Sequence, residues 1–439
     1  MTTLVKAVRG TRDLLPPETA LWSRIEATAR DVFARYHFGE IRTPIFEETA
    51  LFARGVGEET DIVSKEMYTW EDRARAQSEK TQSLTLRPEN TAGVVRAYIE
   101  HKLGETGQLH KLFYIGPQFR RERPQKGRYR QFFQIGAEVI GPSHAGSESP
   151  LRDAEVLEML ATLLDELGIT GWTLKLNSVG SATDRPVYLA RLREALAPVV
   201  SRMCADCQRR AETNPLRVLD CKVPEDQPII DSLPRIGDSL DEASRTHFAA
   251  VCAALDAAQV PYTLDHRLVR GLDYYTRTTF EFTHGGLGAQ NALLGGGRYD
   301  GLSEALGGPR APGIGFAIGQ DRLVLTLQAQ QQTESTLADA CIAPVGEAQN
   351  PAALALAREL RRTNKDNAGL CVELGDGSFR VRKSMEIADK QARNIVLLGE
   401  DEVLSGMLTV KNFSTGVQNK IPRAELAAYL LASRPQAKA

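Results

Sequence analysis

The sequence has little of what marks secreted, membrane-spanning or strongly basic proteins. Six cysteines in 439 residues are too few for a disulfide scaffold, so we expect reduced thiols and a cytoplasmic protein. No signal peptide and no long uncharged apolar run occur, so we expect neither export nor a membrane span. The formal net charge is only −2, so a surface that binds nucleic acid has to be local.

Two kinds of site motif are missing or incomplete. No Walker A sequence occurs, and the glycines of GIGFAIGQDR do not have the G-x-G-x-x-G spacing, so arginines and a sheet would have to hold any ATP phosphates. Cys204 and Cys207 form a C-x-x-C pair and Cys221 follows, but a structural zinc site needs a fourth ligand. Because no second C-x-x-C is present, we expect reduced structural cysteines and no metal there.

The length and composition predict a folded chain of two or three domains. Hydrophobic residues make up 42% and charged residues 25%, an ordinary balance for a globular protein. Residues 1–327 alternate between helical and strand-like patterns, interrupted at about 184–261 by a helical insertion that contains several prolines. A polar linker is expected at 328–336. Residues 337–439 alternate strand and helix, as in a small α/β domain.

A hairpin is the clearest local structure predicted in the first domain. It lies between two predicted helices, over residues 18–36 and 151–167. The runs KLFYIGPQF and FFQIGAEVI alternate like strands, and the basic segment RRERPQKGRYR joins them. On the second strand one face is apolar, whereas Gln134, Gly136 and Glu138 share the other.

The polar face and the basic tip of this hairpin each allow two interpretations. The polar face could bind a cation or a ring N–H, or could simply meet water, as antiparallel sheets often do. The arginines of the tip could bind phosphate oxygens in pairs, or could form an ordinary solvated surface. The pattern of residues leaves both choices open.

Three further segments contain candidate binding residues. Glu89 and Thr91 stand near the start of a predicted helix, where they could hold an ammonium group or be ordinary helix N-terminal residues. The glycines of LVRGLDYYTRTTFEF and ALLGGGRYDGL allow a ligand to approach the backbone closely. These two segments also supply Arg270 beside a glycine and three tyrosines that could contact a substrate ring or belong to the core: Tyr274, Tyr275 and Tyr299.

Together these segments resemble a bacterial-type histidyl-tRNA synthetase along nearly the whole chain. The N-terminal segment IRTPIFEETALFARGVGEETDIVSKEMY resembles motif 1 of the class II synthetases. GPQFRRERPQKGRYRQFFQIGAEVIG resembles motif 2, and PGIGFAIGQDR resembles motif 3. LVRGLDYYTRTTFEF and LGGGRYDGL resemble the two stretches peculiar to the histidine enzymes, and they carry most of the specificity.

The resemblance implies a fold and a reaction. The fold is α+β, a class II catalytic antiparallel sheet flanked by helices, with a helical insertion and a C-terminal α/β anticodon-binding domain, assembled as a homodimer. The reaction is that of a ligase that uses ATP and Mg²⁺. L-Histidine and ATP give histidyl-adenylate and pyrophosphate, and histidine then passes to the 3′ end of tRNA(His).

The resemblance also implies roles for individual residues. Arg120 is expected to hold the α-phosphate and Arg322 the γ-phosphate of ATP, while Arg270 stabilises charge at the reacting phosphate and carboxylate. Arg120 and Arg270 are thus the expected catalytic residues, and no metal is expected to be held by the protein itself. The residues expected around histidine are Glu89, Asn90, Thr91, Arg120, Gln134, Glu138, Arg270, Tyr274, Tyr275 and Tyr299. Glu138 and Tyr275 are expected to contact the two imidazole nitrogens.

Contacts with tRNA are expected in two places. Arg123 and Gln125, at the tip of the hairpin, are candidates for reading the acceptor end. Anticodon-arm phosphates could meet basic residues on or beside the helix predicted from residue 378, although a solvated face remains an alternative: Arg380, Arg382, Lys383, Lys390 and Arg393.

Two other functions share this fold. One is the regulatory paralogue that partners ATP phosphoribosyltransferase, and the other is a tRNA-sensing module attached to a kinase. Such regulatory proteins usually lack the anticodon domain, which this chain retains, and no kinase motifs occur here.

Overall fold

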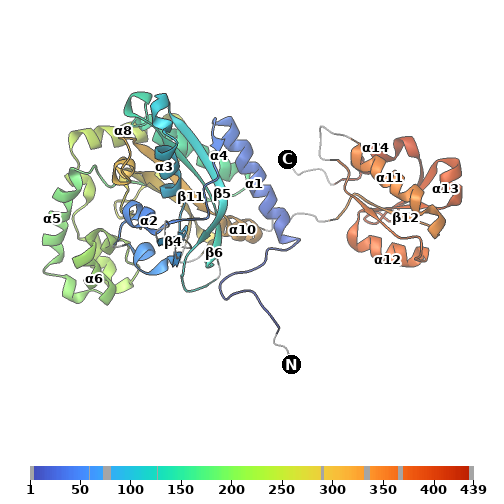
Figure 1. Cartoon of the computed structure of the whole chain (residues 1–439), viewed down its shortest axis with the longest axis horizontal. Coiled ribbons are helices and arrows are strands. Elements are labelled where there is room, and N and C mark those ends of the chain that lie inside the picture. The colour runs from blue at the N-terminus through green and yellow to red at the C-terminus, as the bar shows by residue number, and fades with distance from the viewer. Residues whose placement is uncertain are drawn as a thin grey trace. The chain divides into compact units, whose positions relative to one another are not determined.

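A computed structural model describes residues 4–58, 60–72, 81–125, 127–287, 291–330, 337–363 and 369–434. The chain divides into two compact units, Met1–Thr333 and Glu334–Ala439 (Figure 1). Among the described residues, none of the helices has the length and apolar character that crossing a membrane requires.

The first unit is built on an eight-stranded sheet with the order β1-β5-β6-β11-β10-β9-β7-β8. Neighbouring strands from β5 to β7 are antiparallel, and only the two edge pairs, β1 with β5 and β7 with β8, are parallel. The antiparallel sheet predicted from the sequence is therefore confirmed. Its strands are β1 (Gly39–Glu40), β5 (His110–Phe119), β6 (Gln131–Ile140), β7 (Trp172–Ser178), β8 (Tyr262–Leu264), β9 (Thr276–His284), β10 (Ala292–Arg298) and β11 (Gly313–Gly319).

The predicted hairpin is confirmed as β5 and β6, which pair in register from His110 with Ile140 to Phe119 with Gln131. Its apolar face forms part of the main core, since Ile135 and Val139 are fully buried. The same core holds apolar residues of four helices: α1 (Glu18–Arg35), α4 (Pro150–Glu166), α8 (Glu242–Ala257) and α10 (Gln320–Ala329). These helices cover one face of the sheet and leave the polar face for a site.

Two of these helices show why the sequence folds locally as it does. The apolar residues of α1 recur at helical spacing, and Phe33 packs against the rings of Phe113 on β5 and Phe316 on β11, with centroids 5.0 and 6.1 Å apart. Burying one such side chain contributes about 1.5–3 kcal/mol. Helix α4 begins where the Ser149 hydroxyl accepts a hydrogen bond from Leu151 N, and it ends before Gly168, whose φ is 73°.

A buried ion pair joins α4 to the end of β10. Arg298 and Asp153 are both fully buried, and their Nη1 and Oδ1 atoms lie 2.5 Å apart. Arg298 also donates to Asp300 and to the backbone oxygen of Ser147. Removing one partner of such a pair costs about 3–5 kcal/mol because the other charge stays buried. This pair therefore holds the strand end that carries Tyr299.

The rest of the first unit surrounds the open face of the sheet. A three-stranded sheet has the order β2-β4-β3, formed by β2 (Phe46–Glu48), β3 (Tyr68–Asp72) and β4 (Gln82–Leu86). Short helices accompany it: α2 (Thr49–Val56), α3 (Thr91–Glu100) and α9 (Leu302–Ala305). Between β7 and β8 the chain forms α5 (Asp184–Leu196), α6 (Ala205–Thr213), α7 (Gln227–Asp231) and α8. In Figure 1, α5 and α6 lie on the opposite side of this unit from α1.

The second unit has a five-stranded sheet with the order β13-β12-β14-β15-β16. Strands β13, β12 and β14 are parallel, and β15 and β16 continue the sheet antiparallel. Its strands are β12 (Ala340–Pro344), β13 (Val372–Leu374), β14 (Asn394–Leu398), β15 (Met407–Asn412) and β16 (Gln418–Pro422). Its helices are α11 (Asn350–Arg362), α12 (Val381–Gln391), α13 (Glu400–Ser405) and α14 (Leu426–Ala432).

The alternation of strand and helix predicted for this unit is confirmed, with two differences in detail. Helix α12 begins at Val381 and not at Ser378, because Arg380 adopts an extended backbone conformation. Helix α10 continues to Ala329, two residues into the expected linker, and residues 331–336 lie outside the described part of the chain.

Candidate active site

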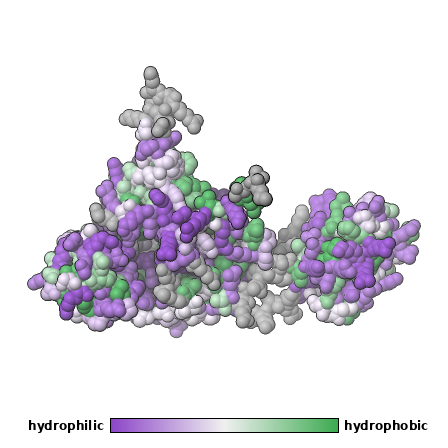
Figure 2. Space-filling model, turned by 90° about the horizontal axis from the view of Figure 1, so that it is seen from below, coloured by the Kyte–Doolittle hydropathy of each residue, from purple (hydrophilic) through white to green (hydrophobic). Residues whose placement is uncertain are grey.

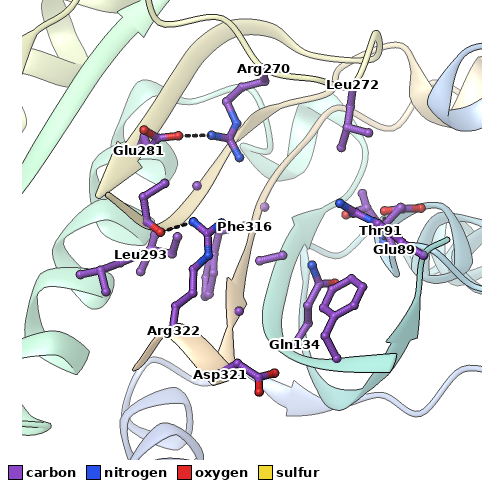
Figure 3. Close-up of a pocket in the computed structure, with 18 of the residues that line it drawn as sticks. Glu89, Thr91, Gln134, Arg270, Leu272, Glu281, Leu293, Phe316, Asp321 and Arg322 are labelled. Atoms are coloured by element: carbon purple, nitrogen blue, oxygen red, sulfur yellow. Dashed lines mark hydrogen bonds and ion pairs between the residues drawn. The ribbon is translucent and has the colours of Figure 1, made fainter. Parts of the chain in front are cut away.

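A cavity of about 320 Å³ lies over the polar face of the large sheet (Figure 3). This volume is within the range of small-molecule sites, about 300–1,000 Å³. Nine of the residues singled out from the sequence line it: Glu89, Thr91, Arg120, Gln134, Arg270, Tyr274, Tyr275, Tyr299 and Arg322. They come from segments far apart in the chain, and the antiparallel strands bring them together.

The floor of the cavity consists of glycines because charged and aromatic side chains lie directly on it. A Cβ atom at Gly295 would approach the guanidinium carbon of Arg270 to 2.6 Å, and one at Gly315 would approach Glu138 Oε2 to 1.7 Å. Gly315 is also paired with Glu138 across β11 and β6. The glycine runs of β10 and β11 therefore leave space for the site residues.

One end of the cavity is polar and enclosed. Glu138 is fully buried beneath it and accepts hydrogen bonds from the hydroxyl groups of Thr91 at 2.7 Å and Tyr114 at 3.4 Å. Burial, with no cationic side chain to offset it among these contacts, raises the pKa of Glu138 from 4.5 to about 8. Gln134 is also buried, and its Oε1 atom has no hydrogen-bond partner among the described residues. This end can therefore accept hydrogen bonds from a ligand.

Aromatic rings form the wall beside this polar end. The ring of Tyr274 lies 4.8 Å from that of Tyr275 and 6.0 Å from that of Tyr299, measured between centroids. Burial raises the pKa of the Tyr275 hydroxyl, which keeps it protonated and able to donate. A flat polar ring would find both stacking surfaces and hydrogen-bonding groups here.

Glu89 shows that a structural role and a binding role can coexist. Its two carboxylate oxygens accept hydrogen bonds from the backbone N–H groups of Thr91 at 2.7 Å and Ala92 at 3.0 Å, at the start of α3. The alternative of an ordinary helix N-terminal residue therefore holds in this structure. Since each carboxylate oxygen has a second lone pair, Glu89 can still face a cation in the cavity that it lines.

Two arginines, Arg270 and Arg322, mark the other end of the cavity, and a third, Arg120, lies on the side of Glu89. Arg270 Nη1 donates to Glu281 Oε2 at 2.6 Å, and Arg322 donates to the backbone oxygen of Ala292. Arg120 Nε donates to the backbone oxygen of Pro88 at 2.9 Å. In Figure 3 the guanidinium groups of Arg270 and Arg322 lie near one another on the side of Glu281, across the cavity from Glu89 and Thr91.

The arginines that line the cavity have only partial charge compensation. Burial lowers the pKa of Arg322, an effect that the nearby charge of Arg128 reinforces. The Arg120 guanidinium lies 5.3 Å from the ring of Phe132, a cation–π distance. An anionic ligand near these arginines would be bound more strongly than by the same charges in water. The reason is that the arginines are partly desolvated, which strengthens charge–charge interactions.

Four candidate residues do not line the cavity. Asn90 is buried and accepts a hydrogen bond from the Thr43 hydroxyl at 2.6 Å, and Glu138 lies behind Thr91. Arg123 and Gln125 are exposed at the tip of the hairpin. Their position leaves them free to meet a macromolecule and not a small ligand.

Tyr114 and Glu281 are among the lining residues that the sequence did not single out. Tyr114 pairs with Gly136 across the hairpin and therefore lies on the same polar face as Glu138. Applying the strand alternation to β5 as well as β6 would have found it. Glu281 contacts Arg270 at 2.6 Å, but its position within a strand gives no sequence signal for that contact.

Comparisons with known proteins agree on one family. A profile described as histidyl-tRNA synthetase matches residues 10–323, and one described as anticodon binding domain matches residues 339–433. The histidine–tRNA ligase of Koribacter versatilis (strain Ellin345) is 70% identical over 428 residues, covering 97% of this chain and 96% of that protein. That of Solibacter usitatus (strain Ellin6076) is 56% identical over 429 residues, covering 97% and 99%.

A solved structure agrees with these sequence relatives. The crystal structure of apo S. aureus histidyl-tRNA synthetase is 36% identical to this chain and superposes with a TM-score of 0.77. The superposition covers 97% of this chain and 100% of that chain.

Proposed function

The chain belongs to the histidyl-tRNA synthetase family and charges tRNA(His) with histidine, and we propose that the cavity over the sheet is where it does so. One observation carries this proposal. A single cavity joins the side chains around buried Glu138, suited to a polar ring, with three arginines suited to phosphates. The regulatory and sensor alternatives lose support, because relatives named histidine–tRNA ligase match 97% of the chain, both units included.

In this proposal the polar end of the cavity holds histidine. Tyr275 would contact one imidazole nitrogen, and Tyr274 and Tyr299 would flank the ring. Glu138, which lies directly beneath the lining residues Thr91 and Gly315, would contact the other nitrogen at the bottom of the cavity. Because Glu138 shares one exchangeable proton with its ligand, it can donate to one ring tautomer and accept from the other. An amino acid without ring nitrogens would leave these buried groups unpaired, and a site of this kind rejects such ligands strongly.

The α-amino group then lies between Glu89, Thr91 and Gln134. Gln134 Oε1 is buried without a partner among the described residues, so an ammonium N–H would satisfy it. Asn90 would act only indirectly, by supporting the turn before α3. These contacts orient the histidine carboxylate towards the arginines.

Activation requires that a histidine carboxylate oxygen attack the α-phosphorus of ATP while the bond to pyrophosphate breaks. Arg120 would hold the α-phosphate and Arg322 the γ-phosphate. Arg270, positioned by Glu281, would stabilise the negative charge that builds up between the carboxylate and the phosphorus. Catalysis in this scheme comes from positioning and charge stabilisation.

Magnesium fits this cavity as part of the ATP complex. The carboxylates lining the arginine end, Glu122, Glu281 and Asp321, already accept from arginines at 3.0, 2.6 and 3.0 Å. Mg²⁺ commonly uses substrate phosphates and water with one or two carboxylates. We therefore infer that Mg²⁺ would enter with ATP and would supply positive charge near the leaving pyrophosphate.

In the second step a hydroxyl of the terminal adenosine attacks the activated carbonyl, and AMP leaves. Arg123 and Gln125, exposed at the hairpin tip, are positioned to meet the acceptor end. In the second unit Arg380, Arg382, Lys383 and Lys390 are exposed on or beside α12, where anticodon-arm phosphates could bind. On the face of this unit seen in Figure 2, hydrophilic residues lie between hydrophobic patches.

We also propose the domain limits, the assembly and the location. Residues 1–327 would form the catalytic domain, with the insertion at about 184–261, and residues 337–439 the anticodon-binding domain. A homodimer is supported by exposed apolar residues on the small sheet, where the rings of Phe46 and Trp70 lie 6.1 Å apart. Light scattering of the purified protein should therefore give the mass of two chains. We place the protein in the cytoplasm.

Changing Arg270→His tests the proposed chemistry. Because Arg270 acts on charge in the transition state, histidine-dependent ATP–pyrophosphate exchange should fall by about 10²–10³-fold or more. Binding of tRNA(His) should be nearly unchanged, since the residue lies in the cavity. Arg310→His is a matched control, because Arg310 is exposed and pairs with Glu148 on the surface. Near-normal exchange by the Arg270 variant would remove this residue from the mechanism.

A further inference from the structure

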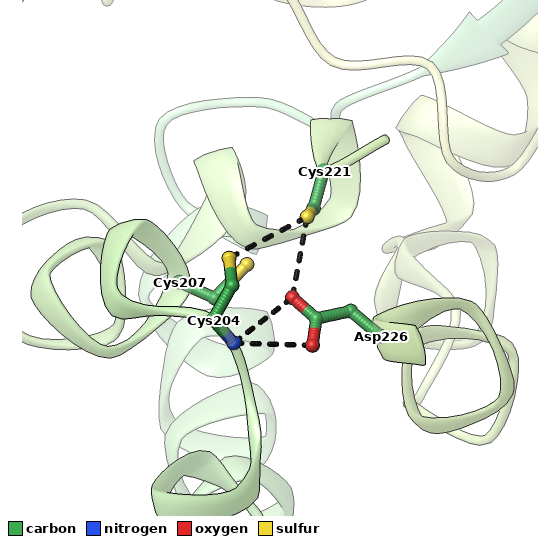
Figure 4. A group of neighbouring side chains, drawn as sticks. All are labelled: Cys204, Cys207, Cys221 and Asp226. Carbon is green, nitrogen blue, oxygen red and sulfur yellow. Dashed lines mark hydrogen bonds between the residues drawn. The ribbon is translucent and has the colours of Figure 1, made fainter. Parts of the chain in front are cut away.

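Four potential metal ligands meet in the helical segment between β7 and β8, and none of them lines the cavity of the proposed active site. They are the thiols of Cys204, Cys207 and Cys221 and the carboxylate of Asp226, and their ligand atoms all lie within 4.8 Å of one another. Figure 4 shows the three sulfur atoms and the carboxylate turned towards a common centre. From this geometry we propose that the cluster is a structural zinc site.

The distances favour a zinc ion over a disulfide. Sulfur ligands about 2.3 Å from a tetrahedral zinc ion lie about 3.8 Å from each other. The sulfur atoms of Cys204 and Cys221 lie 3.9 Å apart. A disulfide needs about 2.05 Å and would leave the buried thiol of Cys207 beside Asp226 without a bonded partner. Three thiols and one carboxylate match the four-ligand rule for structural zinc.

Asp226 supplies the ligand that the cysteine spacing alone does not reveal. It is 1% exposed, and the described residues give it no ion pair. Its Oδ2 atom lies 3.3 Å from the sulfur of Cys221, and both its oxygens accept from the backbone N–H of Cys204, at 3.1 and 3.2 Å. A buried carboxylate among three thiols gains stability from a divalent cation.

Surrounding hydrogen bonds support this arrangement. The Gln227 amide, next to Asp226, donates to the backbone oxygens of Cys221 at 3.0 Å and Val223 at 2.8 Å. Arg267 in turn donates to Gln227 Oε1 at 2.7 Å. Such contacts orient the residues that hold a metal.

The position of the cluster explains what a zinc ion would stabilise. Cys207 and Cys221 are part of a buried cluster that also includes Val269 and Tyr275, on either side of Arg270. The ligands come from the loop before α6, from α6 itself and from the segment that leads to α7. These segments contain only short helices, so they have few hydrogen bonds of regular secondary structure to hold them together. A bound metal would link them to one another and hold them against the wall of the cavity. All four positions are filled by protein, so the ion would be structural and not catalytic.

Metal analysis of the full-length protein tests the proposal. The protein is purified under reducing conditions without chelator, and its metal content is measured by elemental analysis and by native mass spectrometry. We expect one zinc ion per chain. Cys207→Ser and Asp226→Asn should each lose the ion, whereas Cys252→Ser, a matched control on α8, should keep it.

A second measurement covers variants that fail to fold. Unaltered protein is stripped with a chelator and reloaded with Co²⁺, and a thiolate-to-cobalt charge-transfer band is expected. The proposal is overturned if stripped, reduced protein binds neither ion, if the purified protein holds a metal other than zinc, or if thiol titration reveals a Cys204–Cys221 disulfide.

Discussion

At the scale of single residues, Glu138 connects local environment to substrate choice. It is a fully buried carboxyl group without a cationic partner among its described contacts, so the neutral form is favoured. A neutral carboxylic acid that faces an imidazole can share its proton with the ring. A charged, hydrated carboxylate distinguishes less well between an imidazole and other hydrogen-bond donors. In the proposed histidine site, the raised pKa of Glu138 would therefore help to select the ligand.

The pKa of Glu138 predicts how stability depends on pH. Since the folded-state pKa of about 8 lies above the ordinary 4.5, the folded protein holds a proton that the unfolded chain releases. The free energy of unfolding should fall as the pH rises from 4.5 to about 8 and then level off. Each pKa unit corresponds to about 1.4 kcal/mol. Denaturant titrations at several pH values, without histidine, measure the free energy of unfolding of both proteins. It should fall less with rising pH for Glu138→Gln, and an equal dependence on pH in the two proteins would contradict the assigned pKa.

The sequence predicted nine of the residues that line the cavity, for reasons that differ among them. Strand alternation placed Gln134 and Glu138 on one face, and the resemblance to a family supplied roles for Arg120, Arg270 and Arg322. Glu281 could not be predicted, because its contact with Arg270 depends on how the loop before β9 folds back over the sheet. Asp226 could not be predicted either, because only the fold brings it to the cysteines.

At the scale of elements, glycines in two neighbouring strands explain why there is space for a cavity over the sheet. Strands β10 and β11 lie side by side, and glycines on their open face leave room for the side chains of Arg270 and Glu138. The predicted hairpin and main helices were correct because their hydrophobic period is strong. The short strands β15 and β16 were missed. Strand β16 is a largely exposed edge, and the buried run of β15 is only three residues long, Leu408–Val410.

Gly315→Ala tests this explanation of β11. The added methyl group would lie 1.7 Å from Glu138 Oε2, so the carboxyl group has to move. Overpacking of this kind costs about 1–3 kcal/mol. The KM for histidine in pyrophosphate exchange should rise by roughly 10–100-fold, since about 1.4 kcal/mol corresponds to a factor of ten. Gly301→Ala, which meets nothing within 4 Å, is the control, and an equal effect in both variants would refute the steric explanation.

At the scale of the whole molecule, the two units have separate cores, and we propose that each carries a different part of the function. The core of the first unit contains α1, α4 and the large sheet, and that of the second contains α11 and the five-stranded sheet. The described part of the first unit contains all the residues that line the cavity. Activation of histidine should therefore not require the second unit, whereas recognition of tRNA should.

A chain that ends at Thr333 separates these two activities. It should retain histidine-dependent pyrophosphate exchange, because its core and cavity are complete. Charging of tRNA(His) should fall by at least about tenfold, equivalent to about 1.4 kcal/mol of lost binding. Both rates are measured beside the full-length protein. Full charging by the shortened chain would contradict the role given to the second unit, and loss of exchange in folded protein would contradict the independence of the first.

The most direct test of the central claim is the amino-acid dependence of ATP–pyrophosphate exchange in the full-length protein and its Glu138→Gln variant. The account predicts exchange with histidine and with none of the other amino acids. It also predicts that Glu138→Gln raises the KM for histidine far more than the KM for ATP. Exchange with an amino acid that lacks ring nitrogens, or an unchanged KM for histidine in the variant, would contradict the assignment of this cavity.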